Sequence, residues 1–303
     1  MNPALRRSGS LGKWLVSGPP IVYLLLFFAI PALIMVLASF RTPGEFGGLA
    51  PLIDEAGKPD LNVESYVRFF TEPVYAQIFV KSFVYALLTT LICLAVAYPL
   101  ATLVARSPKK HRDLLLLLVI LPFWSNFLIR VYAWMIVLGP QAALARTVNG
   151  LLGWFGAGPV PLLFSSFAVL VCLVYVHLPF MVLPLYANLE KHDQALLDAA
   201  QDLGANAWQR FWRVTFPLSL PGVYAGSALV FIPAFGIFAI PDILGGPNDS
   251  LIGNVIKQQF LETRDWPFGS VLSIVLTVCA LGIAGAAAWV GQRGVGRLAA
   301  GDA

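Results

Sequence analysis

The sequence predicts an all-α membrane protein with six transmembrane helices, both termini in the cytoplasm, and a helical cytoplasmic loop between spans four and five. Of its 303 residues, 58% are hydrophobic and only 12% are charged, whereas soluble domains average about 45–50% apolar and about 25% charged residues. Six mostly apolar stretches reach the roughly 20 residues that a helix needs to cross a bilayer. Backbone groups in lipid must be hydrogen-bonded within their own segment, so we expect each stretch to be helical. The six ranges are 16–40, 82–105, 114–138, 162–187, 218–241 and 270–291.

The N-terminal region resembles the start of a secretory signal peptide. Arg6, Arg7 and Lys13 precede an apolar run, as basic residues do in a signal peptide. The run from Val16 to Phe40 is longer than the apolar region of a signal peptide, which has about 7–15 residues. We therefore expect it to remain as the first span.

The distribution of Lys and Arg residues predicts the orientation, because cytoplasmic loops carry an excess of them. With a cytoplasmic N-terminus, twelve of the 20 lie inside, seven lie outside, and Arg130 lies within a span. Four of the inner ones crowd into 106–112. The predicted organisation is a cytoplasmic N-terminus at 1–15, a six-helix transmembrane domain at 16–292 and a cytoplasmic tail at 293–303.

The segments on the predicted outer side carry ten acidic residues against seven basic ones. This excess favours a cationic solute or a basic docking partner, although a solvated loop surface has the same composition. In the first outer loop, Asn62 is placed to cap a short helix that runs through Phe70. The Glu72–Pro73 step would end that helix.

The sequence contains little that could support catalysis on this chain. Cys93, Cys172 and Cys279 each lie in an apolar run without a Cys-x-x-Cys spacing, which is typical of small buried residues and predicts neither a disulfide nor a metal site. His177, the one histidine within a predicted span, is more typical of packing than of catalysis. Motifs of esterases, zinc proteases and phosphate-binding loops do not occur. The alternative from another functional class is an intramembrane enzyme. Nucleic acid is disfavoured as a partner, because the net charge is only +4 and the basic residues form no long run.

The loop 189–217 predicts two short helices that meet at a glycine. Asp193 can cap a first helix from Gln194 to about Leu203. Gly204 suits the left-handed residue that closes a helix. Asn206 can then cap a second helix, with Gln209 three residues later as in a capping box.

The second short helix predicts a surface for contact. Its apolar face carries Trp208, Phe211 and Trp212, and its basic face carries Arg210 and Arg213. We expect Pro217 to end it before span five begins. A rigid elbow with exposed aromatic residues suits a groove in a partner protein. An interfacial helix lying on lipid would carry the same residues, so both interpretations stay open.

Within this loop, Asp198-Ala199-Ala200 followed by Gly204 and Pro217 resembles the "EAA" loop of binding-protein-dependent ABC importer permeases. The departure is Asp198, where the family usually has Glu. In that family the loop forms the coupling helices that seat in a cleft of the ATPase subunit. The resemblance implies that the ATPase contact consists of Asp198, Ala199, Ala200, Leu203 and Gly204.

Four other stretches are recognisable, namely Leu121–Trp134, Pro179–Tyr186, Ile240–Phe260 and Arg264–Gly269. They resemble the spermidine/putrescine branch of this family. The resemblance implies that the partners are a second homologous permease, two ATPase subunits and a periplasmic solute-binding protein, assembled with membrane lipid in the bacterial inner membrane. It also implies that this chain binds no cofactor of its own, since ATP and Mg²⁺ belong to the ATPase chains. Permeases for an opine, an amino-acid derivative, thiamine or ferric ion are the alternatives.

Candidate solute-path residues fall in the third span and in the outer loops. Aromatic rings can hold amine groups by cation–π contact, although an aromatic belt of lipid-facing residues would have the same composition. Arg130 would repel a polycation, so a structural ion pair or a gate suits it better than ligand binding. Carboxylates at the outer mouth could guide a cation or meet the binding protein. The candidates are Trp124, Asn126, Arg130, Tyr132, Trp134, Asp242, Glu262 and Asp265.

Overall fold

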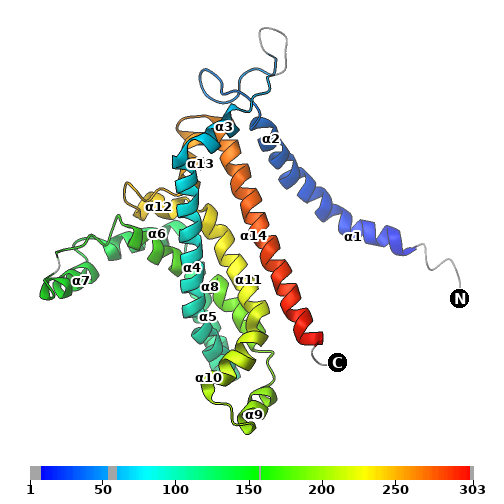
Figure 1. Ribbon diagram of the computed structural model, residues 1–303, viewed down its shortest axis with the longest axis vertical. Helices are drawn as coiled ribbons and strands as arrows, with labels where there is room; N and C mark the ends of the chain where they lie inside the picture. Colours follow the sequence, from blue (N-terminus) through cyan, green and yellow to red (C-terminus); the bar gives the residue numbers. More distant parts are fainter. Residues whose placement is uncertain (1–7, 54–59, 157, 301–303) are drawn as a thin grey trace. The chain divides into compact units, whose positions relative to one another are not determined.

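The computed structural model describes the backbone of residues 8–53, 60–156 and 158–300 (Figure 1). Apart from isolated bridge residues at Pro43, Leu49 and Ile53, the regular structure of these residues is helical. The α-helices are α1 (Ser8–Leu24), α2 (Ile30–Ala38), α3 (Glu64–Thr71), α4 (Pro73–Arg106), α5 (Lys109–Ile120), α6 (Phe127–Leu138), α7 (Ala143–Trp154), α8 (Ser166–Leu189), α9 (Gln194–Asp202), α10 (Ala207–Arg210), α11 (Phe216–Gly236), α12 (Ala239–Leu244), α13 (Ile252–Leu261) and α14 (Trp266–Ala300). Short π and 3₁₀ turns occupy Leu25–Ala29, Leu121–Trp124 and Phe211–Thr215.

Six helical segments of the described chain have the length and apolar composition to cross a membrane, which confirms the predicted number of spans. Their bounds differ from the predicted ones by several residues, most of all in the third. The segments are Val16–Ala38, Pro73–Arg106, Phe127–Trp154, Ser166–Leu189, Ala207–Gly236 and Trp266–Ala287.

The chain forms two compact units. The first comprises Met1–Pro73 with Ile256–Val275, and the second comprises Val74–Val255 with Leu276–Ala303. In the first unit, α3 begins after Asn62, whose Oδ1 accepts the Glu64 N–H at 2.7 Å. The helix ends at Thr71, and Glu72 is extended before Pro73. The short helix predicted for this loop is therefore confirmed.

The centre of the second unit is the packing of α8 against α11. About half of the most apolar stretch of each helix is buried, 56% in α8 and 44% in α11. Gly222 and Gly226 let the two backbones approach, because a Cβ at Gly226 would lie 2.7 Å from Met181 Sδ and one at Gly222 would lie 2.8 Å from Asn188 Cβ. Small residues at such crossings are typical of helix pairs in membranes.

The predicted third span is not one helix. Helix α5 ends at Ile120, a 3₁₀ turn follows, and Ser125 is extended before α6 begins at Phe127. Pro122 donates no N–H, and Asn126 accepts the Leu128 N–H at 2.8 Å as the cap of a new helix. The apolar segment that follows therefore runs over Phe127–Trp154, which combines α6 and α7.

The prediction that Pro217 ends the second short helix is wrong. Helix α10 passes through a π turn over Phe211–Thr215 directly into α11, where Pro217 occupies the first turn. Pro is tolerated in a first turn, and a π turn changes the register of the backbone carbonyls just before it. The fifth candidate span therefore begins at Ala207, and it ends at Gly236 because Ile237 is extended.

Candidate functional site

The elbow between α9 and α10 has the predicted backbone geometry. Asp193 Oδ1 accepts the Ala195 N–H at 3.0 Å and so caps α9. Gly204 has φ +79, a conformation that a residue with a Cβ rarely adopts. The Gly204 N–H donates to Gln201 O at 2.8 Å, and the Ala205 N–H donates to Ala200 O at 3.0 Å. These bonds satisfy carbonyls at the end of α9 and turn the chain sharply.

A reciprocal capping box begins the second arm of the elbow. The Gln209 N–H donates to Asn206 Oδ1 at 2.9 Å, and the Asn206 N–H donates to Gln209 Oε1 at 3.0 Å. Across the turn, Arg210 Nη1 donates to Gln201 Oε1 at 2.6 Å. This last bond joins the two arms directly, so the elbow is held by side chains as well as by backbone.

The tip of the elbow is exposed. Leu203 is 88% exposed although it is a large apolar residue. Asp198, Ala199 and Gly204 are also exposed, whereas Ala200 is half-buried. Figure 1 places α9 and α10 at one end of the bundle that α4, α8 and α11 form. An exposed apolar tip on a rigid turn suits contact with another protein.

Aromatic packing fixes the second arm of the elbow to the bundle. The Phe211 ring lies 5.3 Å from the ring of Tyr98 on α4 and 6.0 Å from that of Phe216. The Tyr98 hydroxyl in turn lies 2.9 Å from Ser219 Oγ on α11. A displacement of the elbow would therefore act on α4 and α11 through packed rings.

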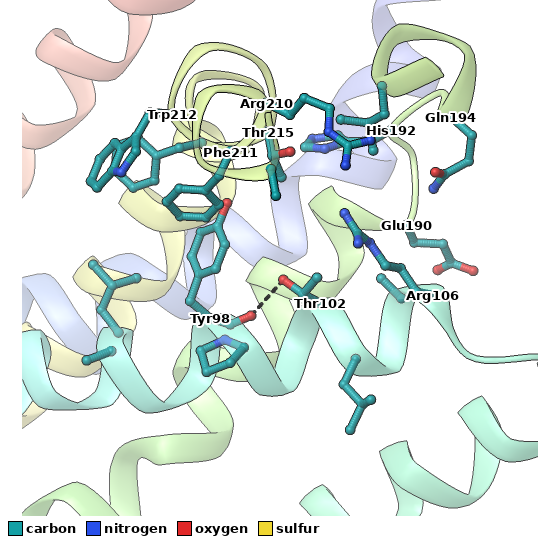
Figure 2. Close-up of a pocket in the computed structure, with 18 of the residues that line it drawn as sticks. Tyr98, Thr102, Arg106, Glu190, His192, Gln194, Arg210, Phe211, Trp212 and Thr215 are labelled. Atoms are coloured by element: carbon teal, nitrogen blue, oxygen red, sulfur yellow. Dashed lines mark hydrogen bonds between the residues drawn. The ribbon is translucent and has the colours of Figure 1, made fainter. Parts of the chain in front are cut away.

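A cavity of about 1450 Å³ lies behind the elbow, between α4, the end of α8 and the α9–α10 segment. Figure 2 shows Tyr98, Thr102 and Arg106 along α4 on one side, with Arg210 and Trp212 opposite. Burial lowers the pKa of His192, another lining residue, although a hydrogen bond with the Leu218 backbone opposes this shift. Arg112 forms an ion pair with Glu190, and both also line the cavity.

The structure does not bring the five candidates of the predicted third span into one site. Trp124 is 75% exposed, Tyr132 is 50% exposed, and Asn126 serves as the cap of α6. The Trp134 ring packs edge-on against Tyr175 at 5.5 Å. None of the five lines either of the two cavities described here.

Arg130 lies with its guanidinium 5.2 Å from the centre of the Phe123 ring. Within the described residues no carboxylate lies within 4.0 Å of it. Its Nε is buried and has no hydrogen-bond partner among the residues that the structure describes. The observed contact is therefore a cation–π interaction.

The three candidate acids have different environments. Asp242 Oδ1 accepts a hydrogen bond from Asn254 Nδ2 at 2.9 Å. Both residues line a cavity of about 490 Å³ in the second unit, together with Phe164. Asp265 and Glu262 belong to the first unit, where Glu262 is exposed.

Asp265 has two structural partners within the first unit. Its Oδ2 lies 3.1 Å from Arg68 Nη1, and its Oδ1 accepts the Phe268 N–H at 3.1 Å at the start of α14. Arg68 also lies over the Phe268 ring at 4.3 Å. These contacts link α3 to α14.

Sequence reasoning missed a polar cluster around Asp249. Ser166 Oγ donates to Asp249 Oδ1 at 2.6 Å, and Lys81 Nζ lies 3.5 Å from the same oxygen. Burial raises the pKa of Asp249, but the bonds from Ser166 and the Gly246 N–H, with the charge of Lys81, outweigh it and leave the pKa below its usual value. Asp249 is one of ten acidic residues on the predicted outer side. Its partners Ser166 and Lys81 lie 83 and 168 residues away in the sequence, so no local pattern indicates the cluster.

Comparison with known proteins agrees with this architecture. Residues 97–293 match the family described as "Binding-protein-dependent transport system inner membrane component". The "Spermidine/putrescine transport system permease protein PotB" of Escherichia coli K12 is 43% identical over 258 residues, covering 84% of this chain and 89% of that protein. The protein of the same name from Haemophilus influenzae is 44% identical over 256 residues, covering 84% and 86%.

Solved structures show the same fold at low sequence identity. A chain of a bacterial alginate ABC transporter, in complex with an alginate pentasaccharide-bound periplasmic protein, matches 96% of each chain with a TM-score of 0.72 and 19% identity. A chain of an inward-facing MetNI methionine ABC transporter matches 74% of this chain and 99% of its own length, with a TM-score of 0.56 and 16% identity. With the family match over most of its length and the relatives above 40% identity, this chain belongs to the family of binding-protein-dependent transport system inner membrane components.

Proposed function

We propose that this chain is the permease subunit of an ATP-driven importer for the polyamines spermidine and putrescine. The observation that carries this proposal is its 43% identity over 258 residues to relatives named as spermidine/putrescine permeases. The structure supports this proposal, because its apolar helices form a bundle with an exposed elbow at one end. The role of this chain is therefore transport, and ATP is hydrolysed on another chain.

The elbow transmits movement from the ATPase in this proposal. Asp198, Ala199, Ala200, Leu203 and Gly204 form the contact, within a coupling loop at 189–217. Since Phe211 packs on Tyr98 and Phe216, a push on the elbow reaches α4 and α11 and switches the access of the solute path. ATP and Mg²⁺ bind to two ATPase subunits, and a second homologous permease completes the path.

The orientation follows from the basic residues, with both termini and the elbow in the cytoplasm of a bacterium. The tails are 1–15 and 293–303, and the domain between them crosses the inner membrane. A periplasmic solute-binding protein delivers the cation to the opposite face. There Asp242, beside Asn254 and Phe164 in its cavity, offers a carboxylate to an amine group.

Uptake of labelled spermidine into proteoliposomes tests the solute. The chain is co-expressed with an ATPase, a second permease and a binding protein from the same organism, and uptake is measured with ATP inside. We expect uptake that requires the binding protein and that excess putrescine inhibits. If the binding protein stimulates ATP hydrolysis but spermidine is not taken up, the chain is still part of an importer and the polyamine assignment is wrong. The solute would then be an opine, an amino-acid derivative, thiamine or ferric ion.

A further inference from the structure

Two guanidinium groups face the cavity behind the elbow, and no carboxylate of the described residues pairs with either of them. Arg106 lies at the end of α4 and Arg210 at the end of α10, and both line the cavity. Figure 2 shows both side chains directed into the space between these helices. Among the described residues, neither forms an ion pair, and Arg210 bonds to the neutral Gln201 side chain.

The other titratable groups of the cavity do not offset these two charges. Arg112 and Glu190 neutralise each other in their ion pair. The pKa of His192 is lowered by burial, which favours its neutral form. The cavity therefore holds two uncompensated positive charges, and like charges that share a site are unfavourable. An anion between them would remove this cost.

Away from these charged groups the cavity wall is mostly apolar, with Thr102, Gln194 and Thr215 as polar exceptions. Leu94, Ala95 and Pro99 line it along α4. Leu94 and Arg106 are twelve residues apart on one helix, which corresponds to about 18 Å. Figure 2 shows Trp212 and Phe211 opposite the Tyr98 part of α4, whereas Arg210 lies toward Arg106. The cavity is therefore elongated, with an apolar part and a basic end.

The position of the cavity matches the level of lipid headgroups. Arg106 is the last residue of one candidate span, and another begins at Ala207. Trp208 and Trp212 in that second span are 69% and 46% exposed, as is typical of aromatic residues at a membrane interface. A free anion would use only the basic end, whereas a phospholipid would fill both parts.

We propose that this cavity binds an anionic membrane phospholipid, with its phosphate between Arg106 and Arg210 and its acyl chain along the apolar face of α4. Basic pockets between helices on the cytoplasmic side are suited to such headgroups. The bound lipid would lie directly against the segment that carries the elbow. This site is independent of the transported solute.

Native mass spectrometry of the whole assembly tests the proposal. The complex is reconstituted in nanodiscs of equal parts phosphatidylglycerol and phosphatidylcholine, and the lipids that it retains after transfer to detergent are counted. We expect wild type to retain phosphatidylglycerol selectively. Removing one arginine near the headgroup should lower the affinity for the lipid about fivefold. The double variant Arg106→Gln with Arg210→Gln should therefore weaken retention about thirtyfold.

Lys109→Gln with Lys110→Gln is the matched control, because these exposed basic residues follow α4 and do not line the cavity. We expect it to keep selective retention. An equal loss in both double variants would contradict the proposal, since it would indicate diffuse surface charge. Absence of retained lipid in wild type would also overturn it, and would indicate that another protein segment fills the cavity.

A free anion is distinguished by competition. Millimolar inorganic phosphate should leave the retained phosphatidylglycerol in place, and displacement by phosphate would overturn the lipid assignment. If the double Gln variant fails to assemble, Arg106→Lys with Arg210→Lys preserves both charges, and it should retain more lipid than either single Gln variant. Equal lipid retention by the double Lys variant and the two single Gln variants would contradict a site built from these two charges.

Discussion

Ser166 Oγ lies 2.6 Å from Oδ1 of Asp249, so the first residue of α8 donates a hydrogen bond to a carboxylate in the loop between α12 and α13. Asp249 is only 6% exposed. Lys81 Nζ on α4 also donates to Asn248 O beside it, so the cluster joins three segments of the second unit at one end. Buried charges of this kind are retained only where they are paired and hydrogen-bonded.

Asp249→Asn should lower the free energy of unfolding by about 1–3 kcal/mol near neutral pH, because hydrogen bonds to a charged acceptor are lost. The native pKa of Asp249 lies below its usual value. The stabilisation is thus complete above the unfolded pKa of about 3.9 and is lost as the pH falls through the lower native pKa. Thermal unfolding of both proteins from about pH 7 to pH 3 measures this. A stability difference that does not narrow below about pH 4 would contradict the assignment.

Gly226→Leu should destabilise the protein by about 1–3 kcal/mol, as overpacked cores do. A Cβ there would lie 2.7 Å from Met181 Sδ and 3.3 Å from Met181 O on α8. Gly282→Leu is the control, since a Cβ at Gly282 meets nothing within 4 Å. Thermal melts in one detergent compare the two. Equal melting temperatures would show that the α8–α11 crossing is looser than described.

The parts of the fold that depend on local interactions could be predicted from the sequence. The helix caps are recognisable, because they involve hydrogen bonds between residues two or three positions apart, at Asp193, Gly204 and the Asn206–Gln209 pair. The interpretation of Pro217 as a helix end also rests on its local sequence, but the helix continues through it because of a π turn that packing of Phe211 supports. The Asp249 cluster joins positions far apart in the chain, and no short-range pattern indicates which of the ten outer acids is buried.

Leu203→Asp should abolish association with the ATPase and leave stability nearly unchanged. The side chain is 88% exposed, and exposed substitutions usually change stability by less than about 0.5 kcal/mol. Leu261→Asp, at another exposed leucine (69%), is the control and should keep the ATPase bound. Co-purification and thermal melts measure both effects. Retention of the ATPase by Leu203→Asp would exclude the elbow tip as its contact.

Asp242→Asn should raise the half-saturating concentration of spermidine, whereas Asp265→Asn should not. Asp242 lines a cavity with Phe164 and accepts a hydrogen bond from the neutral Asn254 side chain there, while the Asp265 carboxylate is paired with the charged Arg68 and caps the start of α14. We expect the Asp265→Asn protein to fold, because Asn also caps helices well. The ion pair between Asp265 and Arg68 is partly exposed, so its loss lowers the free energy of unfolding by about 1 kcal/mol or less. Initial uptake rates at several spermidine concentrations distinguish the two variants. Equal effects would contradict this separation of roles.

The coupling role of the elbow is measured by the number of spermidine molecules imported per ATP hydrolysed, in Gly204→Pro and in Gly204→Asn. Pro fixes φ near −65°, whereas the elbow requires φ +79. Asn adopts the left-handed conformation readily. We expect Gly204→Asn to keep coupled uptake and Gly204→Pro to lose it, with the bundle still folded. Coupled uptake at the wild-type ratio in Gly204→Pro would show that the elbow does not couple ATP hydrolysis to transport.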